Sequence, residues 1–451
     1  MSPSQPSLPP GPRWPVPYAT AAWMARPWST LERCRARYGD TFSLRIAHEG
    51  DWVFVSDPES VKQVFTGDPR LLHAGEANTV LLPIVGAHSV LLLDEGKNLE
   101  QRKLLLPPFH GERMQRYGEL MSEAATRQIE TWPSGEPIAL GPRMQAITLE
   151  VIMRAVFGIE DAGRLERLGT MLRNMLSDVM SPRGFIFPML LGPERAAKLL
   201  RSRMRPIDEA IGELIAERRR DPALEERDDI LSLLIAARHS DDEPMSDAEL
   251  RDELMTLLVA GHETTATALS WTFERLIRNP GALRRLEDEI ASGDDAYLDA
   301  VIAEVLRLRP VISLVLRRLV EPMEIGGHLL PAGASVAPCI YLMHRRADLY
   351  PDPHAFRPER FLDSPPKTYS WIPFGGGVRR CIGASFAQFE MKAVLRAVLS
   401  SASLSTTDPA SERPTRRAIT HVPARGAEVL ARRRVAAAVP PARAPVPATA
   451  A

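Results

Sequence analysis

The sequence predicts a mainly α-helical fold with a small β part, which is an α+β class. Helical patterns dominate from about Pro58 to Arg309. Short β-branched and aromatic runs separated by turn signals lie before this region and again after Pro310. Apolar residues make up 45% and charged residues 25% of the 451 residues, as is ordinary for a globular protein. This composition excludes a disordered, collagen-like or coiled-coil chain.

Both ends of the chain are expected to be unpacked. Residues 1–17 form a proline-rich arm with seven prolines. Residues 434–451 are almost only Ala, Pro, Val and Arg, and a segment without large apolar residues is expected to be disordered. Between them we find neither an internal repeat nor a long linker, so residues 18–433 are predicted to form a single domain.

The β part is expected in two places. The runs Thr41 to Ile46 and Trp52 to Ser56 predict two early strands with a turn between them. After Pro310, short apolar runs alternate with glycine-containing turns, which predicts a small sheet. An irregular proline-rich segment over 351–373 and a helix from Ala384 to Leu399 follow.

Charge, cysteine content and hydropathy limit the partners. The 56 Lys and Arg residues balance 57 Asp and Glu residues, which gives no overall attraction to nucleic acid or an anionic membrane. The chain has three cysteines, Cys34, Cys339 and Cys381, and no CxxC pair, so a reducing compartment such as the cytoplasm is expected. No apolar run reaches the roughly 18 residues that a membrane helix needs, and residues 1–17 do not have the pattern of a secretory signal.

The strongest helix signal covers residues 246–278. Ser246 and Glu249 fit a capping box at its start, and Pro280 closes its end. Its apolar middle is interrupted by the segment 260–265, which reads Ala-Gly-His-Glu-Thr-Thr. Gly in a helix interior costs roughly 1 kcal/mol relative to Ala, a buried Glu needs a partner, and Thr can bond back to a carbonyl. Such a cluster indicates either a small-ligand site or a helix kink at a packing contact.

The segment 374–383 reads Phe-Gly-Gly-Gly-Val-Arg-Arg-Cys-Ile-Gly. Its three consecutive glycines permit a tight turn, and a helix starts just after Cys381. The helix N-terminus and the arginines before the cysteine would stabilise a thiolate, and Phe374 can lie against a flat apolar partner. The pattern predicts a sulfur ligand with one open face, because no neighbouring Cys or His completes a zinc site. A buried structural cysteine is the alternative.

These motifs resemble those of the cytochrome P450 monooxygenases. The segment 374–383 is similar to that family's haem-binding loop, and 260–265 is similar to its oxygen-activating helix. Glu-Val-Leu-Arg at 304–307 matches the family's Glu-x-x-Arg helix, and Phe-Arg-Pro-Glu-Arg-Phe at 356–361 is a fourth match. The order and spacing also agree, and the resemblance spans roughly residues 10–430. It implies a cytochrome P450-like fold and haem b as the cofactor.

The resemblance implies roles for the residues around the haem iron. Cys381 would be the proximal thiolate ligand, which favours O–O cleavage and leaves the opposite face open for O2. Thr264 matches the threonine that hydrogen-bonds the oxygen being activated, and Glu263 matches the acid that helps to relay protons. Ala260 and Gly261 match the small residues that leave space for oxygen.

The resemblance also implies cations for the two haem propionates. Arg379, Arg317 and Arg102 match in position, and Arg suits a carboxylate better than Lys. The family usually has Trp or His where this chain has Asn98, so weaker local haem anchoring is expected, by around 1–3 kcal/mol. Three loop residues complete the expected cofactor contacts: Phe374, Gly375 and Gly383.

A buried charge network is expected to brace the cysteine loop. Glu304 and Arg307 lie one turn apart on the same helix face, and Arg360 would join them. Buried charges are costly unless each is paired, so the predicted role is structural.

The resemblance implies a hydrophobic small-molecule substrate such as a fatty acid, a terpenoid or steroid, or a polyketide-like compound. The segments expected to line the pocket, about 72–93, 181–191 and 311–316 among them, are rich in apolar residues. No flavin or iron–sulfur module fits in the remaining residues, so electrons are expected from a separate ferredoxin or flavodoxin with its reductase. The side of the protein that docks the electron donor is expected to be basic, through Arg379, Arg380, Lys103 and Arg113. The nearly neutral net charge of the whole chain does not exclude such a local basic patch.

Two other functions stay open at this point. The first keeps the haem but changes the reaction to a peroxide-driven oxygenation or an isomerisation. The second is a haem-binding sensor or carrier without turnover. The Glu263–Thr264 pair disfavours both, because neither requires a proton relay.

Overall fold

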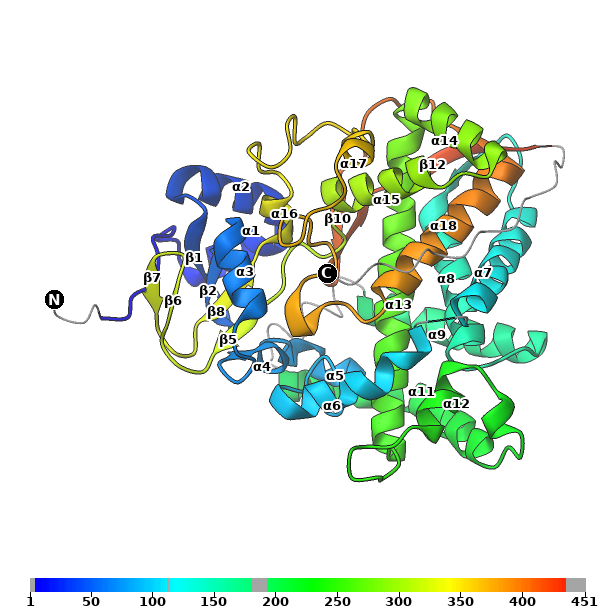
Figure 1. Cartoon of the computed structure of the whole chain (residues 1–451), viewed down its shortest axis with the longest axis horizontal. Helices are drawn as coiled ribbons and strands as arrows, with labels where there is room; N and C mark the ends of the chain where they lie inside the picture. The colour runs from blue at the N-terminus through cyan, green and yellow to red at the C-terminus, as the bar shows by residue number, and fades with distance from the viewer. Residues whose placement is uncertain (1–4, 110, 112, 181–192, 435–451) are drawn as a thin grey trace.

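The computed structural model describes residues 5–109, 111, 113–180 and 193–434. Figure 1 shows a sheet-rich part beside a larger helical part, with the helix α13 (Asp247–Ile277) running through the helical part. This division agrees with the cytochrome P450-like, mainly α fold with a small β part that the sequence predicts.

The helices fall into a long and a short group. The long helices are α1 (Val16–Ala25), α2 (Pro27–Tyr38), α3 (Pro58–Thr66), α6 (Glu95–Leu105), α7 (Arg113–Glu130), α8 (Leu140–Ala155), α9 (Ala162–Met180), α11 (Pro193–Arg219), α13, α14 (Pro280–Ser292), α15 (Ala296–Leu308) and α18 (Ala384–Ser401). The short helices are α4 (Ala74–Ala77), α5 (Leu82–Val85), α12 (Ile230–Ala236), α16 (Ile340–Met343) and α17 (Arg360–Asp363). Single 3-10 turns are η1 (Thr79–Leu81), η2 (Pro107–Phe109), η3 (Leu224–Glu226) and η4 (Gly377–Arg379).

In the described part of the chain, the strands form one larger sheet and three small ones. The strands are β1 (Thr41–Ile46), β2 (Gly50–Val55), β3 (Leu72–His73), β4 (Pro137–Ala139), β5 (Arg317–Leu319), β6 (Met323–Ile325), β7 (His328–Leu330), β8 (Ser335–Pro338), β9 (Ala402–Ser405), β10 (Pro414–Arg417), β11 (Thr420–Pro423) and β12 (Glu428–Arg433). The larger sheet has the order β1-β2-β8-β5-β3, in which only β2 and β8 run parallel. The early strands therefore share one sheet with β5 and β8 of the later region, whereas β6 and β7 pair with each other in a separate sheet.

The helix α13 organises the main core. Its start has the predicted capping box, because Ser246 Oγ accepts from Glu249 N–H and the Glu249 carboxylate accepts from Ser246 N–H at 2.8 Å. It packs along α8, α11, α15, α18 and β11. Trp271 is fully buried and donates its indole N–H to the carbonyl of His421 at 2.7 Å. This bond fixes the β10–β11 hairpin beside the helix.

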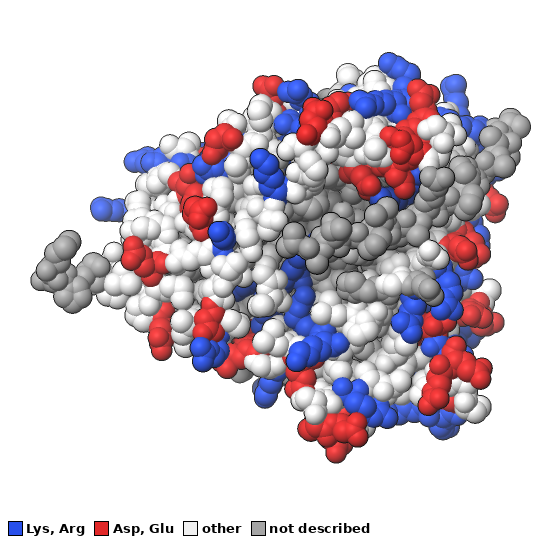
Figure 2. Space-filling view, in the orientation of Figure 1, with Lys and Arg blue, Asp and Glu red and all other residues white. Residues whose placement is uncertain are grey.

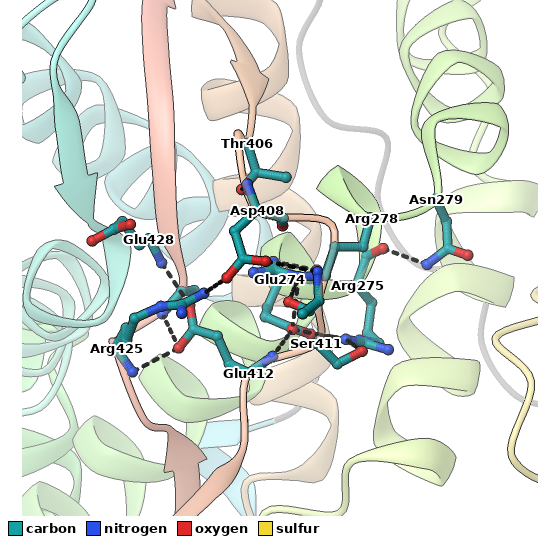
Figure 3. A network of polar contacts seen from close by, with 12 residues as sticks. Glu274, Arg275, Arg278, Asn279, Thr406, Asp408, Ser411, Glu412, Arg425 and Glu428 are labelled. Carbon is teal, nitrogen blue, oxygen red and sulfur yellow. Dashed lines mark hydrogen bonds and ion pairs between the residues drawn. The ribbon is translucent and has the colours of Figure 1, made fainter.

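A buried polar network holds the C-terminal end of α13 (Figure 3). Arg275 donates to the fully buried Glu274 at 2.7 Å, and Glu274 also accepts from the backbone N–H of Glu412 at 2.8 Å. The Glu412 carboxylate in turn accepts from the backbone N–H groups of Arg425 at 2.7 Å and Glu428 at 2.9 Å. A single chain of bonds thus ties α13 to the segments on both sides of the β10–β11 hairpin.

The proline-rich arm differs from its prediction. Ser7 N–H donates to the carbonyl of Leu329 at 2.8 Å, and the carbonyls of Pro9 and Pro10 accept from the side chain and N–H of Ser43. The expectation that this segment is unpacked is wrong for its described residues, since proline lacks an N–H but keeps a carbonyl that accepts hydrogen bonds. The predicted disorder of the other end concerns residues that, from 435 onward, lie outside the described part.

Among the helices of the described residues, none is both long enough and apolar enough to cross a bilayer.

Candidate functional site

The loop before α18 carries the predicted sulfur ligand. Cys381 donates its backbone N–H to the carbonyl of Phe374 at 2.9 Å, which closes the loop. Gly375 and Gly377 have φ values of +69° and +63°, in the left-handed region that favours glycine. A Cβ at Gly377 would collide with the carbonyl of Phe65 on α3, whereas a Cβ at Gly375 would meet open space. The glycine run therefore lets the loop approach α3 on one side and stay open on the other.

The Cys381 side chain combines deep placement with accessibility. Cys34 and Cys339 are buried, but Cys381 is accessible although protein atoms surround it on nearly all sides. Burial raises the pKa of the Cys381 thiol, and the N–H of Gly383, Arg380 and Arg102 act in the opposite direction. The N-cap residue of α18 is Gly383, and a Cβ added to Gly383 would also meet open space. The loop therefore leaves Cys381 accessible at the start of α18.

The middle of α13, like Cys381, combines a position inside the protein with exposed atoms. Ala260 is exposed and Thr264, one turn later, is partly exposed, although most residues of this helix are buried. The Thr264 hydroxyl donates back to the Ala260 carbonyl, the bond expected from the sequence. A Cβ at Gly261 would lie 2.7 Å from the side chain of Ile152 on α8, so close packing of the two helices is a further reason for a glycine at this position. Ala260 is the more exposed of the two small residues.

The Glu263 side chain is buried and lies against two polar side chains. Its side chain is 2% exposed, and Oε2 accepts from the amide of Gln145 at 3.0 Å. Its Oε1 lies 3.4 Å from Nε of Arg417 on β10, without a hydrogen bond. Burial raises the pKa of Glu263, and Arg417 and Gln145 oppose that rise. The acid expected beside Thr264 is therefore held by two residues that sequence motifs did not indicate.

The three predicted propionate arginines gather in one region. Arg317, the first residue of β5, is 6% exposed and donates to the neighbouring carbonyl of Leu316. Burial lowers the pKa of Arg317 to about 10, with Arg379 adding repulsion. Burial likewise lowers the pKa of Arg379 to about 10, with Asp94 opposing and Arg102 adding repulsion. Three cations placed within reach of one another require anionic partners.

One protein carboxylate meets this demand in part. Among the described residues, Asp94 alone forms an ion pair with any of the three arginines, and it does so with Arg379 at 2.6 Å. Asp94 also accepts from the backbone N–H groups of Gly75 and Glu76, so it joins α4 to the cysteine loop. Sequence reasoning missed Asp94, whose only signal was its place just before a helix. Arg317 and Arg102 keep their charges available for another anion.

Asn98 is buried, and its amide faces the protein. Its Nδ2 donates to the carbonyl of Val90 at 2.7 Å, and its Oδ1 has no hydrogen-bond partner within the described structure. The carbonyl of Val90 also accepts from Arg379 at 3.1 Å. Asn98 thus lies against the segment that holds Arg379, and its amide N–H donates to the protein backbone.

The buried charge network is brought together as expected. Arg307 and Glu304 are fully buried and share two hydrogen bonds of 2.7 and 2.8 Å, and Arg360 Nε lies 3.2 Å from the same carboxylate. One turn of α15 also meets the cysteine loop, because the indole of Trp371 donates to the Ala303 carbonyl and packs edge-on against Phe374. The network therefore fixes the segment that supports the loop.

A second buried acid lies between the two central helices. Glu390 on α18 is 1% exposed, hydrogen-bonds with Thr265 on α13, and has no partner for Oε1 in the described structure. Burial raises the pKa of Glu390 to about 8, which the Thr265 contact reduces only in part. No motif used in the sequence analysis included Glu390, although a Glu in an otherwise apolar helix was a signal that could have found it.

The residues at the cysteine loop and the arginine cluster fit a haem. Cys381 is accessible, Phe374 offers an aromatic ring, and the three arginines, with Asp94 matching one of them, leave two positive charges for two propionates. Covalent c-type attachment would need a C-x-x-C-H motif, which the sequence lacks. The donor set thus suits a non-covalently held iron porphyrin with one thiolate ligand.

Comparisons with known proteins show the family and the fold of the chain. A family model described as Cytochrome P450 matches residues 9–426. The chain is 43% identical over 432 residues to cytochrome P450 135B1 of Mycobacterium tuberculosis, covering 94% of this chain and 91% of that protein. It is 39% identical over 410 residues to cytochrome P450 137 of the same organism, covering 90% and 86%. Retinoic acid-bound cyanobacterial CYP120A1 has a TM-score of 0.79 at 23% identity over 96% of this chain and 100% of that one, which shows the fold.

We predict that Glu390→Gln flattens the dependence of stability on pH. The pKa of Glu390 rises from 4.5 to about 8 on folding, so the folded protein holds the extra proton between these values. The resulting stabilisation is complete below about pH 4.5 and is lost as the pH rises through 8. Between pH 6 and pH 9 the wild type should lose about 2 kcal/mol more unfolding free energy than the variant. Denaturant unfolding at both pH values measures this difference, and equal losses would contradict it. Glu119→Gln, at an exposed position on α7, is the control and should behave as the wild type.

Proposed function

Because this chain belongs to the cytochrome P450 family, it is a haem-dependent monooxygenase, and we propose that Cys381 binds the haem iron as a thiolate. The observation that carries this proposal is that, of the three cysteines, Cys381 alone is accessible, in a glycine-rich loop at the start of α18, while Cys34 and Cys339 are buried. When bound, haem supplies the redox chemistry that activates O2. We further propose that it is haem b, held through its two carboxylates by Arg317 and Arg102, with Arg379 as the third cation.

Thr264 and Glu263 are proposed to handle the protons. The Thr264 hydroxyl lies on the open face of α13, where it can hydrogen-bond oxygen on that side of the cofactor. Because burial raises the pKa of Glu263, its carboxyl group holds a proton nearer neutral pH than an exposed acid would. Arg417 and Gln145 keep the carboxyl group turned away from Thr264, so rotation of the Glu263 side chain is required for proton transfer.

A hydrophobic small molecule is the substrate expected for the family, and we propose a fatty acid, a terpenoid or steroid, or a polyketide-like compound. Leu257, Val259 and Ile312 support this, since they are only partly buried and border the main core near Ala260. The expected pocket segment 181–191 lies outside the described residues, so the proposal depends on the other segments.

A redox partner supplies the electrons, and we propose a ferredoxin or flavodoxin with its own reductase. Figure 2 shows Lys and Arg side chains near the middle of the viewed face, with Asp and Glu side chains among them. Arg380 and Lys103 are exposed, whereas Arg379 pairs with Asp94 and Arg113 lies 3.5 Å from Asp228. Only the first two of the four expected cations are therefore proposed to meet the partner.

The proposed ligand is tested by replacing the sulfur. Reduced wild-type protein with carbon monoxide should give the absorption band of a haem thiolate, and Cys381→Ser should lose that band because a hydroxyl does not supply the thiolate's electron density. Cys339→Ser, at a fully buried cysteine on another element, is the matched control and should keep it. The proposal fails if Cys381→Ser and Cys339→Ser give the same spectrum.

Replacing Thr264 should separate electron use from product formation. In Thr264→Ala we expect reductant consumption to continue while product formed per reductant falls by about tenfold or more, because the proton donor to oxygen is lost. Thr264→Ser keeps a hydroxyl and should retain most of the coupling. Product and peroxide are measured against NAD(P)H consumed, and intact coupling in Thr264→Ala would refute the assigned role.

Reversing the charge of Arg380 should weaken docking of the electron donor. Arg380→Glu is expected to slow reduction by a ferredoxin several-fold at low salt and to weaken the dependence of that rate on salt. Arg432→Glu is the control, because Arg432 is exposed on β12 beside the far end of α18, about 27 Å along that helix. Stopped-flow reduction rates over a salt series decide between the two variants, and equal slowing in both would argue against this docking face.

A further inference from the structure

A buried acid in the first half of α13 holds the backbone of a segment next to the arginine cluster. Glu253 is fully buried, and its Oε1 accepts from the N–H of Val90 at 2.7 Å. Its Oε2 has no hydrogen-bond partner within the described structure. Glu253 lies about two turns before Ala260 and has no part in the roles assigned above.

The neighbouring residues of α13 hold the same segment. The Asp252 carboxylate accepts from the N–H of His88 at 2.8 Å, and the hydroxyls of Thr256 and Ser89 lie 2.7 Å apart. Three side chains from one stretch of α13, including Glu253, thus bond to three consecutive residues. The segment 88–90 is fixed to α13 by polar bonds rather than by apolar packing alone.

The other side of the same peptide segment holds Arg379. The carbonyl of Val90 accepts from Arg379 at 3.1 Å and from Asn98 at 2.7 Å. Arg379 also donates to the carbonyl of Leu93 and to the carboxylate of Asp94. The guanidinium group of Arg379 is therefore oriented by segment 90–94, and that segment is in turn held to α13 at Val90.

We propose that Glu253 is a positioning residue for the haem, which acts through the backbone of Val90 on the orientation of Arg379. The inference rests on the proposed function, in which Arg379 is one of the cations for the haem carboxylates. It adds a link between the oxygen-side helix and the edge of the haem that none of the sequence motifs contains.

What Glu253 supplies in this role is a hydrogen-bond acceptor. Burial raises the pKa of Glu253 to about 8, while the Val90 N–H and Gln101 oppose the rise. Near neutral pH the side chain is therefore mainly protonated, and Gln has the same shape with an equivalent acceptor. An apolar residue of similar length fills the space but leaves the Val90 N–H buried without a partner.

The test compares Glu253→Met with Glu253→Gln in the haem-loaded full chain. We expect Glu253→Met to release haem to an excess of an apo-haem acceptor about fivefold faster than the wild type, as loss of one buried bond would give. Its haem midpoint potential should move to lower values, since a cation near the haem has shifted away. Glu253→Gln should restore both quantities to near wild-type values.

A double variant tells the proposed route from general destabilisation. In an Arg379→Gln background, Glu253→Met should produce no further change in haem release, because the residue through which it acts is already gone. Glu274→Gln is the matched control, since Glu274 is equally buried at the other end of α13 and contacts the network of Figure 3 instead. It should leave haem release unchanged even if it lowers stability.

The measurements separate failure of the Glu253 inference from failure of the proposed function. Unchanged release in Glu253→Met, or the same fivefold rise in the Arg379→Gln background, would overturn the inference while the proposed function stands. Failure of the Gln variant to restore the wild-type values would also overturn it. Wild-type protein that took up no haem would overturn the proposed function itself.

Discussion

Everything in the site depends on a buried helix, α13, that must keep one part of its surface open. The helix α13 is held by apolar packing on most sides, yet Ala260 is exposed in its middle. A helix open at this depth needs firm support elsewhere, because the missing contacts cost packing energy. The capping box at its start, the bonds to segment 88–90 and the network around Glu274 and Glu412 supply that support.

Buried positive charge is the second organising feature. Arg317, Arg379 and Arg102 lie near one another, and burial lowers the pKa of each. A cluster of this kind is unfavourable until anions compensate it. Asp94 compensates the cluster in part through its ion pair with Arg379, and the carboxylates of a haem would compensate the charge that remains. Cofactor binding should then stabilise the folded chain, since the ligand binds the folded state alone.

Local motifs indicated which residues would meet but not always how they face. Glu263 was expected beside Thr264, but it turns toward Gln145 and Arg417, which come from distant parts of the chain. Gly261 was expected to make room for oxygen, and what the motif did not indicate is that the missing Cβ also makes room for Ile152 of α8. Side-chain direction on a helix depends on what packs against it, and that information is not local.

The sequence by itself determined the fold class, the long helix with its cap, the cysteine loop and the Glu304–Arg307 pair, because these follow from periodicity, capping and short fixed spacings. Only the tertiary structure decided that Asp94 pairs with Arg379 and that Glu253 accepts from Val90 N–H. It also decided that the proline-rich arm packs on Ser43 and Leu329. Such contacts join residues many positions apart, and their geometry depends on how whole elements pack against one another.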